Sequence, residues 1–335
     1  MIIQTVFSRK LALVLIANSV FSLPLHAATG SRDGRLLVKW KDGPESYAAA
    51  VGNASIGSTV KRNFNAIGWQ HLELPPRMSV RDGMNAYQEL GTVLAVEADG
   101  IIEPILPPER GLQPASPDDE LEGQATGEGN SSDHTTLKRT KVRAHTPPPP
   151  PVLPNDPMFS QQWYLNKISA TNAWNTITGS SNVVVAIIDS GVDYTHPDLA
   201  PNMWRNPGET GVDDQGRDKA NNGIDDDNNG YVDDLHGADI VKGTGDPMDI
   251  GFWFPPDQPA DAIYHGTFIA GLIGAVANNA TGIAGLNWSI QIMAVRLIGG
   301  DYSDPRNFQF TDSITIASWD YVVMMKRARE AMNLN

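Results

Sequence analysis

The sequence predicts an α/β protein built in two parts, a small α+β domain followed by a doubly wound, mostly parallel sheet. Residues 183–188 form an unbroken apolar run in which every residue except Ala186 is β-branched, as in a strand buried on both faces of a parallel sheet. Downstream, strand-like and helix-like patterns alternate, which implies right-handed crossovers between parallel strands. The downstream patterns predict a helix at 265–279, a strand at 290–297 and a helix at 312–331.

The first part covers residues 29–106 and alternates strands with helices. Ser79 has the pattern of a capping residue that begins a helix. In the strand-like stretch at 69–74, His71 is expected to point outward, opposite Leu72. Such an alternation in a short segment predicts a ferredoxin-like split-βαβ sandwich. Its predicted strands are 36–40, 69–74 and 92–97, and its predicted helices are 45–51 and 79–90.

Composition excludes several classes of protein. A formal net charge of -14 argues against a nucleic-acid partner, which would need a basic surface. The chain has no cysteine, so disulfides and thiolate metal sites are excluded. A secreted protein without disulfides needs another form of stabilisation, and bound calcium is one.

The amino terminus has the pattern of a secretory signal peptide covering residues 1–28. Two basic residues (9 and 10) precede a mostly apolar stretch at 11–25, and cleavage is expected near Ala27 or Ala28. The alternative is a membrane anchor, but the stretch is interrupted by polar residues and is shorter than the ~20 residues a span needs. We therefore expect a secreted, extracellular or periplasmic protein with no membrane partner after signal removal.

Residues 107–154 are predicted to be a flexible linker. Acidic, Gly, Ser and Thr residues are followed by a basic patch at 138–143 and by a proline run at 147–151. Such a composition cannot bury enough apolar surface to fold, and a basic flexible segment is easily cleaved.

Two sequence blocks carry a family resemblance. Asp189 follows the buried strand, where open α/β sheets place their sites, although a turn aspartate is the alternative for this residue alone. The first block, from Asp189 to Leu199, reads Asp-Ser-Gly-Val-Asp-Tyr-Thr-His-Pro-Asp-Leu, and the second, at 265–271, reads His-Gly-Thr-Phe-Ile-Ala-Gly. Both blocks resemble those of the subtilisin-like serine proteases (peptidase S8, thermitase-like). The resemblance implies that Asp189 orients the general base His265 during proteolysis of polypeptide substrates. It also implies that 29–106 is a propeptide that inhibits its own protease.

The family's nucleophilic serine is not found in the sequence. It lies in a Gly-Thr-Ser pattern well beyond the histidine, and none of the later serines has that pattern. We expect residues 155–335 to be the amino-terminal part of a peptidase domain that is inactive alone and leaves the strand at 290–297 at an open edge. The alternative is a non-catalytic secreted remnant that binds calcium or inhibits proteases. The later serines are Ser289, Ser303, Ser313 and Ser318.

An acidic loop at 225–233 matches the first nine positions of a calcium-binding loop, with Gly230 at its sharp turn. Position 12 is His236 instead of Glu, so Asp234 or Asp239 would have to complete the shell. A solvated acidic loop is the alternative. The predicted Ca²⁺ ligands are Asp225, Asp227, Asn229, the Tyr231 carbonyl and Asp233.

A second calcium site follows from the resemblance alone. The segment beginning at Asn155 is similar to the entry segment of thermitase-like members, in which two aspartates share an ion. Carried over to this sequence, the pair is Asp156 and Asp198. The alternative for Asp156 is a turn residue before proline.

Overall fold

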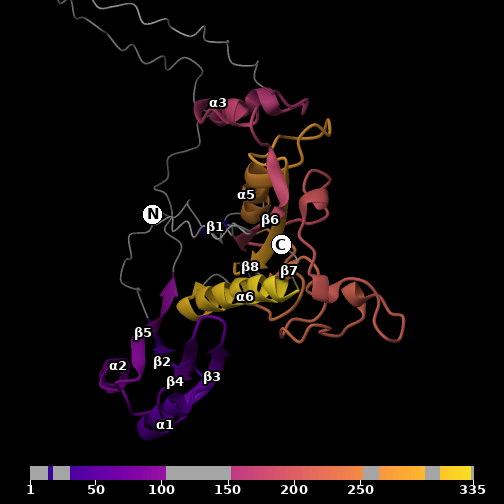
Figure 1. The fold of residues 1–335 in the computed structure, drawn as a ribbon. Helices are drawn as coiled ribbons and strands as arrows, with labels where there is room; N and C mark the ends of the chain where they lie inside the picture. The colour runs from indigo at the N-terminus through magenta and orange to yellow at the C-terminus, as the bar shows by residue number, and fades with distance from the viewer. Residues whose placement is uncertain (1–13, 18–30, 103–151, 252–263, 299–309, 333–335) are drawn as a thin grey trace, which may run out of the picture.

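The computed structural model describes residues 14–17, 31–102, 152–251, 264–298 and 310–332. The predicted signal cleavage site, Ser303 and nearly all of the predicted linker lie outside these residues. The predicted domain boundaries stay predictions. Figure 1 places two sheets on either side of the long helix α6.

The amino-terminal sheet has the predicted split-βαβ arrangement. Its strands are antiparallel in the order β3-β4-β2-β5, with the short β9 added beside β5. Ser79 caps its helix as predicted, since its side chain accepts from the amide of Asp82. The strand β3 was not predicted, because its exposed, polar pattern gives little signal. The elements are β2 (Ser31–Trp40), α1 (Tyr47–Ile56), β3 (Thr59–Phe64), β4 (Trp69–Glu73), α2 (Val80–Gln88) and β5 (Val93–Ile102).

Both faces of this sheet are buried. One face packs with Leu36 and Leu72 against α1 and α2. The other face packs on α6, and the prediction that His71 points outward is therefore wrong. His71 Nε2 lies 3.1 Å from a carboxylate oxygen of buried Asp99, which also accepts from the backbone and the hydroxyl of Ser313 at the start of α6.

The second sheet is parallel, in the order β1-β6-β8-β7. β8 is paired on both sides, so the prediction of an open edge at 290–297 is wrong. The outer partner of β6 in the described part of the chain is β1, which lies within the predicted signal peptide. The strands are β1 (Val14–Ala17), β6 (Gly179–Asp189), β7 (Gly237–Asp239) and β8 (Ser289–Arg296).

Helices cover both faces of the parallel sheet, as a doubly wound fold requires. α5 (His265–Gly274) packs on one face through Ala270 and Ile273. α5 is shorter than predicted because the chain turns extended at Ala275, and the amide of Val276 donates to the Asp198 carbonyl. α6 (Asp312–Ala331) covers the other face and has the predicted bounds.

One apolar core joins the two sheets through α6. Tyr321 and Val322 of α6 belong to the same buried cluster as Leu37 of β2 and Val184 of β6. Each fully buried side chain of this size contributes roughly 1.5–3 kcal/mol. The remaining elements are β9 (Phe310–Thr311), α3 (Trp163–Lys167), α4 (Ala170–Ala173) and the 3-10 turns Phe159–Gln161, Ala200–Asn202, Pro207–Glu209 and Lys219–Asn221.

Candidate active site and acidic cluster

Asp189 ends β6 at the carboxyl edge of the parallel sheet. Its side chain is buried, and its Oδ1 accepts from the amide of Ser190 at 2.7 Å. Its carbonyl accepts from the amide of Leu297, just after β8, at 2.8 Å. The bond to Leu297 therefore holds the Asp189 backbone beside β8, and the Ser190 amide fixes the carboxylate.

His265 is the first residue of α5 and faces this carboxylate. Its Nδ1 lies 2.8 Å from both carboxylate oxygens of Asp189. A carboxylate only accepts, so Nδ1 carries the proton and Nε2 of the neutral ring is a proton acceptor. Nε2 is buried and has no hydrogen-bond partner among the described residues.

The surroundings favour the charged form of His265. The hydrogen bond that His265 donates to Asp189 raises the pKa of the imidazole, and the charges of Asp189 and Asp249 raise it further, while burial opposes them. A histidine bonded to a buried carboxylate at one nitrogen and free at the other can take a proton from a hydroxyl and return it.

Two glycines allow the strand end and the helix start to meet. A Cβ on Gly266 would lie 2.0 Å from the Gly191 carbonyl oxygen. Gly191 has a φ of 102°, and a Cβ there would lie 2.4 Å from the Pro247 carbonyl oxygen. Only glycine fits these two approaches, so both are needed to bring α5 against the Asp189 turn.

Three of the later serines are described, and none serves His265. Ser313 binds Asp99, and the Ser318 hydroxyl donates to the Ile314 carbonyl within α6. Ser289 is an exposed residue at the beginning of β8. α6 lies on the face of the sheet opposite α5, which separates Ser313 and Ser318 from the histidine.

Sequence reasoning missed Asp249. It precedes α5 in the chain, is buried, and accepts from the amide and hydroxyl of Thr267. Sixteen positions separate it from His265 in the sequence. No local pattern therefore connects the two residues.

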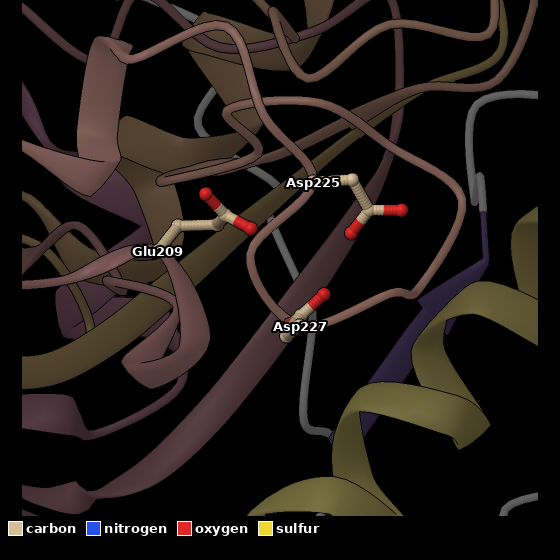
Figure 2. Close-up of side chains that lie close together, drawn as sticks. All are labelled: Glu209, Asp225 and Asp227. Carbon is tan, nitrogen blue, oxygen red and sulfur yellow. The ribbon is translucent and has the colours of Figure 1, made fainter. Parts of the chain in front are cut away.

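A cluster of three carboxylates lies beside the acidic loop. One oxygen each from Glu209, Asp225 and Asp227 lies within 4.8 Å of the other two. Figure 2 shows the three side chains directed toward one another, Glu209 from a different segment than the two aspartates. Sequence reasoning named Asp225 and Asp227 but not Glu209, which precedes them by 16 and 18 positions.

Glu209 is fully buried with half of its carboxylate unsatisfied. Oε1 accepts from the amide of Asp226, whereas Oε2 has no partner among the described residues. Burial, followed by the charges of the neighbouring aspartates, raises the pKa of Glu209 to about 7. An unsatisfied buried oxygen amid like charges is costly unless a cation neutralises it. This donor set of carboxylate oxygens fits a hard divalent cation such as Ca²⁺.

Other residues predicted for this site have different contacts. The Asp233 carboxylate accepts from the amide of Gly223, and Asn229 donates to the buried Asp234. The Tyr231 ring is buried, and its hydroxyl accepts from Arg62; the predicted role of its carbonyl stays a prediction. The two acids considered for completing the shell also have other partners: Asp239 pairs with Arg296 at 2.9 Å, and Asp234 accepts from the Asn206 side-chain amide and the Tyr321 hydroxyl.

Asp156 and Asp198 both accept hydrogen bonds from the loop at 278–283. Asp156 accepts from the amide of Asn278 at 2.9 Å, and Asp198 accepts from the side-chain amide of Asn279 at 2.7 Å and from the amide of Ile283 at 3.1 Å. Both carboxylates are buried. That they share a calcium ion stays a prediction.

Across the residues that the structure describes, no helix combines the length and the apolar character needed to cross a membrane.

Comparison with known proteins divides the chain in two. Residues 180–329 match the Subtilase family, and residues 30–99 match the Fervidolysin N-terminal prodomain. Subtilisin-like protease 1 of Plasmodium berghei is 35% identical over 146 residues, which is 43% of this chain and 21% of the relative. The Thermophilic serine proteinase of Bacillus sp. (strain AK1) is 34% identical over 146 residues, 43% of this chain and 26% of the relative.

The structure is similar to that of fervidolysin from Fervidobacterium pennivorans, described as a keratinolytic enzyme related to subtilisin. The TM-score is 0.49 with 16% identity, over 94% of this chain and 36% of that one. The chain spans about a fifth of the length of the Plasmodium berghei relative and about a quarter of the length of the Bacillus relative.

Proposed function

We propose, because residues 180–329 match the Subtilase family, that this chain is part of a secreted, calcium-stabilised serine endopeptidase in which Asp189 and His265 are the catalytic acid–base pair. The observation that carries the proposal is the hydrogen bonding of His265. Its Nδ1 is held by Asp189 at 2.8 Å, while its buried Nε2 has no partner among the described residues. Polypeptides are the proposed substrates.

The chemistry of the pair follows from that geometry. His265 Nε2 would take the proton of a serine hydroxyl as that oxygen attacks the peptide carbonyl, and would return it to the leaving amine. Asp189 would hold the ring in the required tautomer and stabilise the imidazolium. The nucleophilic serine and its oxyanion-stabilising partners would come from a part of the protein outside residues 1–335.

A chimera tests this function. Residues 1–335 are joined to the carboxyl-terminal segment of a subtilase relative that carries the Gly-Thr-Ser pattern, and peptide hydrolysis is measured. We expect activity that His265→Ala abolishes and that Asp189→Asn lowers by about 10⁴-fold. A chimera that is equally active without His265 would refute the role of the base.

We also propose that Glu209, Asp225 and Asp227 bind Ca²⁺. The support is the shared position of their oxygens and the unsatisfied, buried Oε2 of Glu209. The ion would neutralise the three carboxylates and join the acidic loop to the 3-10 turn at Pro207–Glu209. Asp156 and Asp198 are proposed as a second site, supported by their burial against one loop.

The amino-terminal domain is proposed to be an intramolecular inhibitor. Residues 30–99 match a prodomain, and this domain packs on α6 of the parallel-sheet domain. Asp320 of α6 accepts hydrogen bonds from the amides of Ala66 and Ile67, which supports a specific association of the two domains. Addition of the separately expressed domain to the active chimera lacking it should inhibit hydrolysis.

A further inference from the structure

We propose that Asp249 is a positioning residue for His265: its carboxylate caps the first turn of α5 from a separate segment and brings a second negative charge to the imidazole. The inference rests on the function proposed for the Asp189–His265 pair. It concerns the state of the histidine, which can be measured without catalysis.

The first turn of α5 is not capped by its own flanking residue. Tyr264 stands at the N-cap position and makes no side-chain hydrogen bond there. Instead, the amide of Gly266 donates to the Ser190 hydroxyl at 2.9 Å, and the amide of Thr267 donates to Asp249 Oδ2 at 3.1 Å. Residues from two other segments therefore supply the acceptors that the helix start needs.

Thr267 connects Asp249 to the strand side of the site. Its hydroxyl donates to Asp249 Oδ2 at 2.7 Å and accepts from the amide of Asp193 at 2.9 Å. Asp193 belongs to the turn that begins at Asp189. A single network thus joins the Asp249 segment, the start of α5 and the turn that follows the catalytic carboxylate.

Asp249 is a buried charge without a basic side-chain partner in the described part of the chain. It is 4% exposed, and its other oxygen accepts from the amide of Gly251 at 3.0 Å. Burial raises its pKa, and the hydrogen bonds from Thr267 and Gly251 oppose that rise. A carboxylate so placed favours a nearby positive charge, and the group near it that becomes positive is His265.

Two carboxylates therefore act on the same imidazole by different routes. Asp189 binds Nδ1 directly, and Asp249 acts through the helix start and through its charge, which raises the pKa of His265. Within the described residues 245–251 of this segment, the other charged group is Asp246, which is exposed and accepts from the Tyr194 hydroxyl. Asp249, and not Asp246, is thus the residue of this segment expected to affect the histidine.

The test is an NMR titration of the histidine ring protons in the full chain, with the His265 signal assigned by its loss in His265→Ala. Asp249→Asn keeps a hydrogen-bond acceptor but removes the charge, and we expect the pKa of His265 to fall. Asp249→Ala should lower it as well, and should speed hydrogen exchange of the Thr267 amide by about tenfold through loss of one hydrogen bond. Asp246→Asn is the matched control and should leave both quantities unchanged.

An unaltered His265 titration in folded Asp249→Asn would overturn the proposal, as would an equal fall in the Asp246→Asn control. If Asp249→Ala does not fold, Asp249→Asn alone decides. This result can be separated from the proposed function. A chimera that hydrolyses no peptide would refute the protease assignment. If Asp249→Asn still lowers the pKa of His265 in the full chain, the positioning role stands.

Discussion

Arg62 of the amino-terminal sheet donates a hydrogen bond of 2.9 Å to the phenolic oxygen of Tyr231 in the acidic loop. The Tyr231 ring meets the Tyr321 ring of α6 edge to face, with 5.1 Å between centroids. The Tyr321 hydroxyl in turn donates to buried Asp234 at 2.6 Å. The prodomain-like domain therefore contacts the same loop that holds the proposed calcium ligands.

This contact predicts an energetic coupling between the domains. Tyr231→Phe and Arg62→Met should each destabilise the chain by about 1–2 kcal/mol, because a hydrogen bond to a charged group is lost. In the double variant the two losses should not add, and thermal or urea unfolding measures the difference. Arg81→Met, at an exposed position of α2, is the control. Fully additive losses would mean that the Arg62–Tyr231 bond contributes nothing.

Calcium should raise the melting temperature of the chain through Glu209. A ligand that binds only the folded state at a hundredfold excess over Kd contributes about 2.7 kcal/mol. Glu209→Gln should reduce this rise, leaving whatever the Asp156–Asp198 site contributes, whereas Asp214→Asn at an exposed neighbouring position should not.

The same variant has the opposite effect without the ion. In chelator near pH 7, Glu209→Gln should match or exceed the parent in stability. The parent carries a buried carboxylate whose Oε2 has no partner among the described residues, and the variant puts a neutral amide in its place. Identical melting curves with calcium and with chelator would contradict the site.

The Asp189–His265 pair should make stability depend on pH. Folding raises the pKa of His265, so the pair contributes fully below the unfolded value of about 6.5 and its contribution is lost as pH rises through the higher folded value. The loss of unfolding free energy caused by Asp189→Asn should accordingly be larger near pH 6 than near pH 9. Urea unfolding at the two pH values measures it, and equal losses would count against the pair.

The chain of residues 1–335 should not react with a serine-directed fluorophosphonate. Ser313 and Ser318 are bonded within the α6 region, on the face of the sheet opposite His265, and neither they nor Ser289 contacts Nε2. Mass spectrometry after incubation should find no stoichiometric adduct, and peptide hydrolysis should stay at background. A stoichiometric adduct at any serine that disappears in His265→Ala would show that the histidine already has a nucleophile.

Local patterns in the sequence determined most of the secondary structure. The β-branched run at 183–188 predicted the buried centre of β6, and the pattern at 312–331 gave both ends of α6. These elements are readable because their apolar periodicity and caps lie within a few residues of one another. The blocks around Asp189 and His265 likewise carried the family resemblance in contiguous residues.

Tertiary structure decided what depends on partners distant in the chain. His71 has the polar, alternating context of an outward residue, but α6 covers that face and Asp99 pairs with it. Glu209 joins Asp225 and Asp227 across 16 and 18 positions, and Asp249 accepts from Thr267 at the start of α5 across 18. No period or spacing encodes such contacts, since they arise only when folded segments pack and a buried carboxylate must find a donor or a cation.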